Sequence, residues 1–144
     1  MASLPKTQCA VQLTGPDKLV INDSKNVPDV GDYQLICRVE VVGLCFSDLK
    51  LLKQFSGHVR KSEVVAGIDT SILDELVNYV PGEKPTVPGH ETVVTVEKVG
   101  DKVTDAKPGD RFLIQADYRW LKTENSNGAF GYNFEGALQQ YILF

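Results

Sequence analysis

The sequence lacks a long apolar run. No stretch of its 144 residues approaches the roughly 20 apolar residues that a membrane-spanning helix needs, so we expect no membrane partner. Residues 1–8 also lack the basic segment and the following apolar segment that mark a secretory signal. Because no export signal is found, the cytoplasm is the expected compartment.

The sequence also lacks an excess of positive charge and an even number of cysteines. The 15 Lys and Arg residues are outnumbered by 19 Asp and Glu residues, which gives a net charge of −4. Binding to a phosphate backbone needs a basic face, so we expect no nucleic acid as a partner. The three cysteines, Cys9, Cys37 and Cys45, are an odd number and do not suggest a disulfide framework.

The length and composition of the sequence are those of one folded domain. Apolar residues make up 42% and charged residues 24%, a composition that can bury a core. Short alternating or apolar runs, separated by glycine and proline, predict a mainly β protein with minor helices. The predicted strands are 7–13, 18–22, 34–42, 91–99, 111–115 and a last one near 137–144.

Hydrophobic patterning also predicts the buried faces and two helices. The odd-numbered residues from Leu35 to Val41 share one strand face, and we expect them, together with Cys9, to be buried. Apolar residues at helical spacing predict helices over 48–55 and 71–80, the second with a capping pair of Ser71 and Asp74. Residues 126–128 are predicted to form a loop.

Two short segments contain side chains that can bind a metal. Segment 43–48 contains Cys45, and segment 88–91 contains His90 and Glu91. A thiolate, an imidazole and a carboxylate are the three ligand types that zinc accepts. Judged by spacing alone, the alternative to a metal site is that Cys45 is a buried structural cysteine and that His90 and Glu91 are a surface pair.

Four motifs follow one another in order around these residues. They are Gly-Leu-Cys-Phe-Ser-Asp at 43–48, Val-Pro-Gly-His-Glu at 87–91, Val-Glu-Lys-Val-Gly-Asp-Lys-Val at 96–103 and Lys-Pro-Gly-Asp-Arg-Phe at 107–112. This order resembles the N-terminal catalytic domain of the zinc-dependent medium-chain alcohol and polyol dehydrogenases. The resemblance runs from about residue 7 to the end of the chain, where residues 135–141 are similar to the glycine-led strand of the family. It implies a GroES-like fold, a partly open β-barrel with a few short helices.

The resemblance also implies roles for individual residues. In the family, the residues matching Cys45 and His90 bind the catalytic zinc, and the glutamate matching Glu91 ligates it or lies beside it. The hydroxyl matching Ser47 passes the proton of the alcohol toward solvent, and the carboxylate matching Asp48 orients the histidine. Asp48 could instead only cap the following helix. Zinc lowers the pKa of the alcohol oxygen, which allows a hydride to pass to NAD or NADP.

The sequence departs from the family in several places. It has no Gly-x-Gly-x-x-Gly turn of a nicotinamide-binding Rossmann domain, so we expect that domain to be absent and the isolated chain to be inactive. We expect the chain to be an expressed fragment rather than a naturally short protein. Residues 112–144 contain no cysteine, so we expect one catalytic zinc and no structural zinc. Residues from about 55 to 84 resemble an insertion near the mouth of the active site. Val93 and Val94 stand where the family commonly has a glycine.

A few polar and aromatic residues allow two interpretations. His58, Arg60 and Lys61 could meet an anionic substrate, but a solvated basic loop is the simpler interpretation. Arg119 and Trp120 could line the cleft, or they could pack at the end of a loop.

The sequence therefore predicts the catalytic-domain portion of a zinc-dependent, NAD(P)-linked dehydrogenase that acts on a small alcohol or polyol. The full-length enzyme could form homo-oligomers. Two alternatives are a zinc-free reductase of the same superfamily and a non-catalytic GroES-like binding module. Zinc bound at Cys45 and His90 would separate the enzyme from the binding module.

Overall fold

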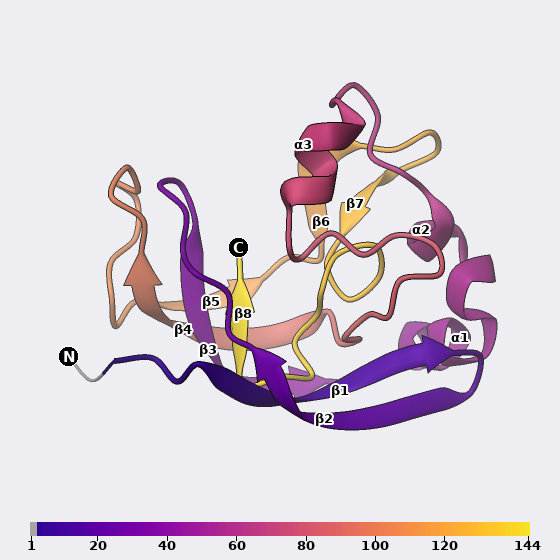
Figure 1. The fold of residues 1–144 in the computed structure, drawn as a ribbon, viewed down its shortest axis with the longest axis horizontal. Coiled ribbons are helices and arrows are strands. Elements are labelled where there is room, and N and C mark those ends of the chain that lie inside the picture. The colour runs from indigo at the N-terminus through magenta and orange to yellow at the C-terminus, as the bar shows by residue number, and fades with distance from the viewer. Residues whose placement is uncertain (1–2) are drawn as a thin grey trace.

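Strands dominate the fold, and four of them form one antiparallel sheet. The computed structural model describes residues 3–144 (Figure 1). The sheet has the order β5–β4–β3–β8 and consists of β5 (Arg111–Ile114), β4 (Glu91–Val99), β3 (Leu35–Gly43) and β8 (Tyr141–Leu143). The mainly β fold with short helices is confirmed, and its strands form three separate sheets rather than one closed barrel.

Two hairpins flank this sheet. Strands β1 (Thr7–Gly15) and β2 (Lys18–Asn26) form a long ribbon along the lower edge of Figure 1. Strands β6 (Asp117–Lys122) and β7 (Asn127–Ala129) form a short one near its top. The prediction of a loop at 126–128 is confirmed for Ser126, which lies in a bend, but is wrong for Asn127 and Gly128, which pair with β6. Strand β6 lacks a clear alternating pattern and was not predicted.

The helices are short and lie between β3 and β4 in the chain. They are α1 (Phe46–Gln54), the 3-10 turn η1 (Phe55–Gly57), α2 (Val59–Ser62) and α3 (Thr70–Glu75). Helix α1 confirms the helix predicted over 48–55. Its buried residue Leu51 packs with Phe55 against Leu13 of β1, which fixes α1 at the end of the long ribbon.

Helix α3 is shorter than the predicted helix over 71–80. Its N-cap is Asp69, whose carboxylate accepts a 2.8 Å hydrogen bond from the backbone N–H of Ser71, so the predicted cap of Ser71 with Asp74 is wrong. Beyond Glu75 the chain makes tertiary contacts instead. The side chain of Asn78, for example, donates a 3.2 Å hydrogen bond to a carbonyl of β8.

The first residues of β1 bury the face opposite to that of Cys9, although Leu13 on the face of Cys9 is fully buried farther along the strand. Cys9 is exposed, whereas Gln8 is 2% exposed and Ala10 is 1% exposed. The Gln8 amide explains this orientation: it donates to Gln139 at 3.2 Å and accepts from the backbone N–H of Tyr141 at 2.6 Å. The buried side chain in this part of β1 is therefore the Gln8 amide, whose two hydrogen bonds satisfy it, and not Cys9, which we expected to be buried.

The face predicted for β3 is only partly buried. Cys37 is fully buried, as predicted, but Val41 is 58% exposed. The pairing of β3 with β4 has register shifts at Ile36/Cys37 and again at Val39/Val41. Each shift interrupts the regular alternation of faces, so a strict period of two cannot hold along the whole strand.

Within residues 3–144, no helix is long and apolar enough to cross a membrane.

Candidate metal centre

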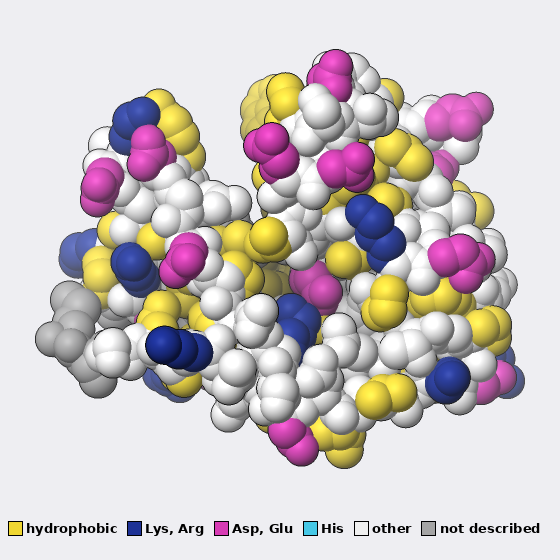
Figure 2. All heavy atoms as spheres, viewed as in Figure 1, with side chains coloured by type: hydrophobic (Ala, Val, Ile, Leu, Met, Phe, Trp, Pro, Cys, Tyr) yellow, Lys and Arg dark blue, Asp and Glu magenta, His cyan; other side chains and the backbone are white. Residues whose placement is uncertain are grey.

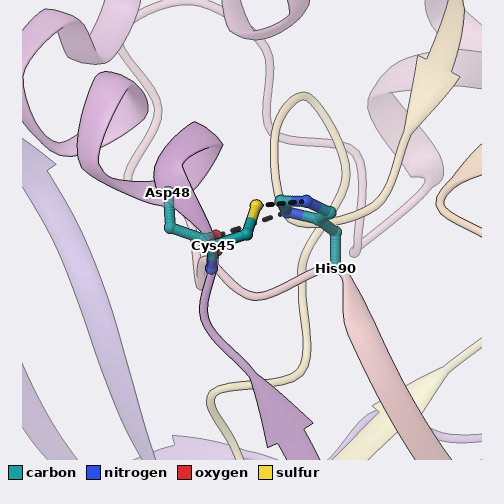
Figure 3. A group of neighbouring side chains, drawn as sticks. All are labelled: Cys45, Asp48 and His90. Carbon is teal, nitrogen blue, oxygen red and sulfur yellow. Dashed lines mark hydrogen bonds and ion pairs between the residues drawn. The ribbon is translucent and has the colours of Figure 1, made fainter.

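The pairing of β3 with β4 brings two distant chemical groups together. Gly43, the last residue of β3, lies opposite Glu91, the first residue of β4. Cys45 follows Gly43 by two residues, and His90 immediately precedes Glu91. The Sγ atom of Cys45 and the Nε2 atom of His90 lie 3.4 Å apart and face each other (Figure 3).

Cys45 is also the N-cap residue of α1. Its backbone N–H donates a 2.9 Å hydrogen bond to Oδ2 of Asp48, and the backbone N–H of Asp48 donates to the carbonyl of Cys45 at 3.1 Å. These reciprocal bonds satisfy groups that are otherwise unpaired at a helix start. The expectation that Asp48 caps the helix is therefore confirmed, and the cap fixes its position relative to Cys45.

The second carboxylate oxygen of Asp48 faces the histidine. Its Oδ1 lies 3.3 Å from Nδ1 of His90, and the two side chains are only 9% and 10% exposed. Neither atom makes a hydrogen bond of regular geometry to any described residue. Burial raises the pKa of Asp48, but His90 and the backbone N–H of Cys45 lower it further, so that the net pKa lies below the usual value and the carboxylate is charged at neutral pH.

These three side chains form a compact set of metal-ligand types. One donor atom from each of Cys45, Asp48 and His90 lies within 4.8 Å of the others. Asp48 approaches one ring nitrogen of His90 and Cys45 approaches the other. Among residues 3–144 this is the one such group of three or more, and its donors match those of zinc.

Glu91 lies outside this group. Its side chain is exposed and lies beside Gly43, where its Oε2 is 3.3 Å from the position that a β-carbon would take. The structure thus brings together Cys45, Asp48 and His90 but not Glu91, and a ligand role for Glu91 stays a prediction.

A tyrosine that the sequence analysis missed lies next to His90. Tyr132 is 3% exposed, and its ring centroid is 5.1 Å from that of His90. Burial raises the pKa of Tyr132, while the nearby, half-buried Ser47 lowers it in part. Tyr132 lies in an irregular turn with no hydrophobic period or motif, so no sequence signal identifies it.

The interpretation of residues 58–61 as a solvated basic loop is wrong. Lys61 is fully buried, and its Nζ donates to the carbonyls of Val80 and, at 2.7 Å, of Lys84. Burial lowers the pKa of Lys61 to about 8. His58 stacks on Tyr132 with a centroid distance of 5.1 Å, while Arg60 forms an ion pair with a carboxylate of β6.

Arg119 and Trp120 contribute nothing to this site. Trp120 is 94% exposed, so the interpretation that it packs at the end of a loop is wrong. The guanidinium of Arg119 donates a 3.2 Å hydrogen bond to Gln115, a neighbour in sequence.

A large groove lies elsewhere on the molecule. Its volume is about 1290 Å³, and it is lined by residues 3–6, 26–30, 95–98, 108 and 109 and by Val77. None of Cys45, Asp48 and His90 lines it. Figure 2 shows a face that is hollowed between the part carrying α3 and the ends of the β3–β4–β5 strands, and neither histidine is visible on that face.

Comparison with known proteins gives one consistent family. Residues 31–144 match the family model described as "Alcohol dehydrogenase GroES-like domain". The chain is 36% identical to a sorbitol dehydrogenase of Bombyx mori over 89 residues, which are 62% of this chain and 20% of the relative. It is 31% identical to a sorbitol dehydrogenase of Macaca fascicularis over 114 residues, which are 79% of this chain and 26% of the relative.

A solved structure agrees at the level of the fold. The 2R,3R-butanediol dehydrogenase of Bacillus subtilis superimposes with a TM-score of 0.70 at 19% identity, covering 95% of this chain and 38% of the other. Relative to the two sorbitol dehydrogenases, the chain spans about a fifth to a quarter of their length.

Proposed function

Because the chain belongs to the alcohol dehydrogenase GroES-like domain family, we propose that it is the catalytic-domain portion of a zinc-dependent, NAD(P)-linked alcohol or polyol dehydrogenase. The observation that carries the proposal is the 3.4 Å approach of the Cys45 sulfur to Nε2 of His90. The sorbitol dehydrogenases among its relatives favour a small alcohol or polyol as the substrate class.

The donor geometry fits a zinc ion held between Cys45 and His90. Zinc bonds to sulfur at about 2.3 Å and to imidazole nitrogen at about 2.0–2.1 Å, in a tetrahedral arrangement. A sulfur and a nitrogen atom bound to one zinc ion at these bond lengths and at a tetrahedral angle lie about 3.5 Å apart. The observed 3.4 Å between Sγ and Nε2 is close to that value without rearrangement of either side chain.

Asp48 has the position of a residue that orients the histidine. Its carboxylate faces Nδ1, the ring nitrogen of His90 that lies away from Cys45. A carboxylate at that nitrogen keeps the proton on Nδ1, so that Nε2 presents its lone pair to the metal. The helix cap holds Asp48 in this position, and its lowered pKa keeps it charged.

Ser47 is the candidate proton carrier. It lies two residues from Cys45 on the first turn of α1, close enough to Tyr132 to lower the pKa of that phenol in part. Zinc, when bound, supplies Lewis acidity that lowers the pKa of a substrate hydroxyl. In this proposal the Ser47 hydroxyl would relay the substrate proton: its oxygen would accept that proton while its own proton passes toward solvent. The nicotinamide of NAD or NADP, held by another part of the protein, would accept the hydride.

The zinc content of the purified chain tests the proposal. The chain is expressed with added zinc and without chelator, as wild type, Cys45→Ala, His90→Ala and Cys9→Ala. We expect about one zinc per chain in the wild type and in Cys9→Ala, since Cys9 is exposed on β1. We expect the zinc to be lost in the other two variants. Zinc retained in both Cys45→Ala and His90→Ala would contradict the assignment of these ligands.

A further inference from the structure

One buried aromatic ring contacts both histidines of the chain. The ring centroid of Tyr132 lies 5.1 Å from that of His90 and 5.1 Å from that of His58, at interplanar angles of 34° and 30°. The guanidinium carbon of Arg60 lies 5.4 Å from the same centroid. Tyr132 thus connects the metal centre to the segment around α2.

The backbone of Tyr132 is fixed by close packing. Its carbonyl accepts a 3.0 Å hydrogen bond from the hydroxyl of Thr86, a fully buried residue. The preceding Gly131 has φ = 81° and lies directly against Gly89 and His90, since a β-carbon there would be 3.0 Å from the Gly89 carbonyl oxygen. Only glycine fits this approach, which presses the turn containing Tyr132 onto the segment containing His90.

The ring of Tyr132 is equally constrained. It belongs to a buried cluster with Leu13, Leu51, Phe55 and Ala129, which come from β1, α1, η1 and β7. A side chain that is buried in this way has little freedom to move, since protein interiors pack at crystal-like density. Its contacts with neighbouring rings are therefore fixed as well.

His90 needs a constraint of this kind. A metal-binding histidine is usually oriented by a hydrogen bond to its second nitrogen. Here Nδ1 of His90 faces Asp48 at 3.3 Å, but the two atoms make no hydrogen bond of regular geometry. Packing against the ring of Tyr132 supplies a second restraint on the plane of the imidazole.

We propose that Tyr132 is a positioning residue for the metal centre, whose ring holds the imidazole of His90 with Nε2 facing Cys45. This inference rests on the proposed function, because it takes His90 to be a metal ligand. The proposal concerns the aromatic ring of Tyr132 and not its hydroxyl, so Tyr132→Phe, which keeps the ring, separates the two.

Nuclear magnetic resonance of the metal-free chain tests the contact. The chain has 2 histidines, so its imidazole C–H spectrum contains two sets of signals, and both rings lie beside Tyr132. Tyr132→Leu and Tyr132→Met should shift both sets, because the ring current of the tyrosine is lost. Tyr79→Leu removes a tyrosine of similar burial, 4% exposed, that packs on Phe134 instead, and should shift neither. Unchanged His90 signals in both Tyr132 variants would overturn the inference.

Binding of Co²⁺, followed by its visible absorption, tests the consequence for the metal. We expect Tyr132→Leu and Tyr132→Met to bind Co²⁺ about 10-fold more weakly with an altered spectrum, as for other residues that orient ligands. Tyr132→Phe keeps the ring and should restore both the affinity and the spectrum, and Tyr79→Leu should match the wild type. Wild-type affinity in Tyr132→Leu and Tyr132→Met would overturn this inference and leave the proposed metal centre intact. A wild-type chain that binds no Co²⁺ would overturn the proposed metal centre as well.

Discussion

The sulfur of Cys45 lies 3.4 Å from Nε2 of His90, although 45 residues separate the two in the chain. Their proximity follows from the register of β3 with β4, in which Gly43 and Glu91 are opposite partners. The candidate metal centre is therefore built at the shared end of two paired strands, and it depends on the central sheet rather than on a flexible loop.

The charge of Asp48 should matter for metal binding but not for folding. In Asp48→Asn, the amide oxygen can still cap α1, so the free energy of unfolding should change by less than about 1 kcal/mol. The charge facing Nδ1 of His90 is lost, so zinc affinity should fall by about 10- to 100-fold. Competition with a chromophoric chelator measures the affinity. Asp69→Asn changes the cap of α3 in the same way and should keep full affinity. Equal affinities in the two variants would contradict this role of Asp48.

The three thiols should differ in reactivity toward a thiol reagent. Cys37 is fully buried and its pKa is raised to about 12 by burial, so it should react only after unfolding. Cys9 is exposed and should react in the folded chain, slowed by Asp23, which raises its pKa. The half-buried Cys45 should react in the metal-free chain and be protected by zinc.

A count of reactive thiols over time checks this order. We expect two without metal, one with zinc and three after denaturation. Two reactive thiols in the zinc-loaded chain would mean that Cys45 does not bind the metal.

Buried Lys61 should make the stability of the chain depend on pH in alkaline solution. Its pKa is lowered from 10.5 to about 8 in the folded chain by burial. Between these two values the unfolded chain binds more protons at this residue, so the free energy of unfolding should rise as pH rises from about 8 to 10.5.

Urea denaturation at pH 7 and pH 9.5 measures this contribution. The wild type should gain about 2 kcal/mol over Lys61→Met between the two pH values. Lys98→Met removes an exposed lysine of β4 and should keep the pH dependence of the wild type. A pH dependence in Lys61→Met equal to that of the wild type would show that Lys61 stays charged in both states.

Gly136 should tolerate no β-carbon. A Cβ there would lie 2.5 Å from the carbonyl oxygen of Gly89 and 2.6 Å from that of Pro88, and both are backbone atoms. Gly136→Ala should therefore lower the free energy of unfolding by about 1–3 kcal/mol, as overpacking does. It should also weaken zinc binding, because the displaced residues directly precede His90.

Gly57→Ala is the matched control, since nothing lies within 4 Å of its β-carbon position. It should leave both the stability and the zinc affinity close to those of the wild type. A fully stable Gly136→Ala variant with normal zinc affinity would contradict the packing described for residues 88, 89 and 136.

The sequence predicted the strands better than their faces. Strand β4 has the predicted bounds, because valine and threonine run through it between clear turns. The expected burial of Cys9 in β1 is wrong, because the hydrogen bonds of Gln8 to distant residues bury that amide instead. Leu13, on the same predicted face, is buried. Hydrophobic patterning contains no information about such long-range partners.

In the candidate site, too, local features of the sequence were predicted and long-range contacts were not. The motifs around Cys45 and His90 identified both residues, and the capping position of Asp48 is a local feature of the sequence. Tyr132 could not be predicted, because its contacts depend on the close approach of Gly131 to Gly89. The burial of Lys61 was also unexpected, since a lysine is seldom enclosed and its two carbonyl partners come from another segment.

X-ray absorption at the zinc edge of the loaded wild-type chain tests the central claim most directly, because it identifies the atoms bound to the metal. The account predicts one sulfur at about 2.3 Å and at least one imidazole nitrogen at about 2.0–2.1 Å, with the sulfur contribution absent in Cys45→Ala. A zinc surrounded only by oxygen and nitrogen atoms in the wild type would contradict it.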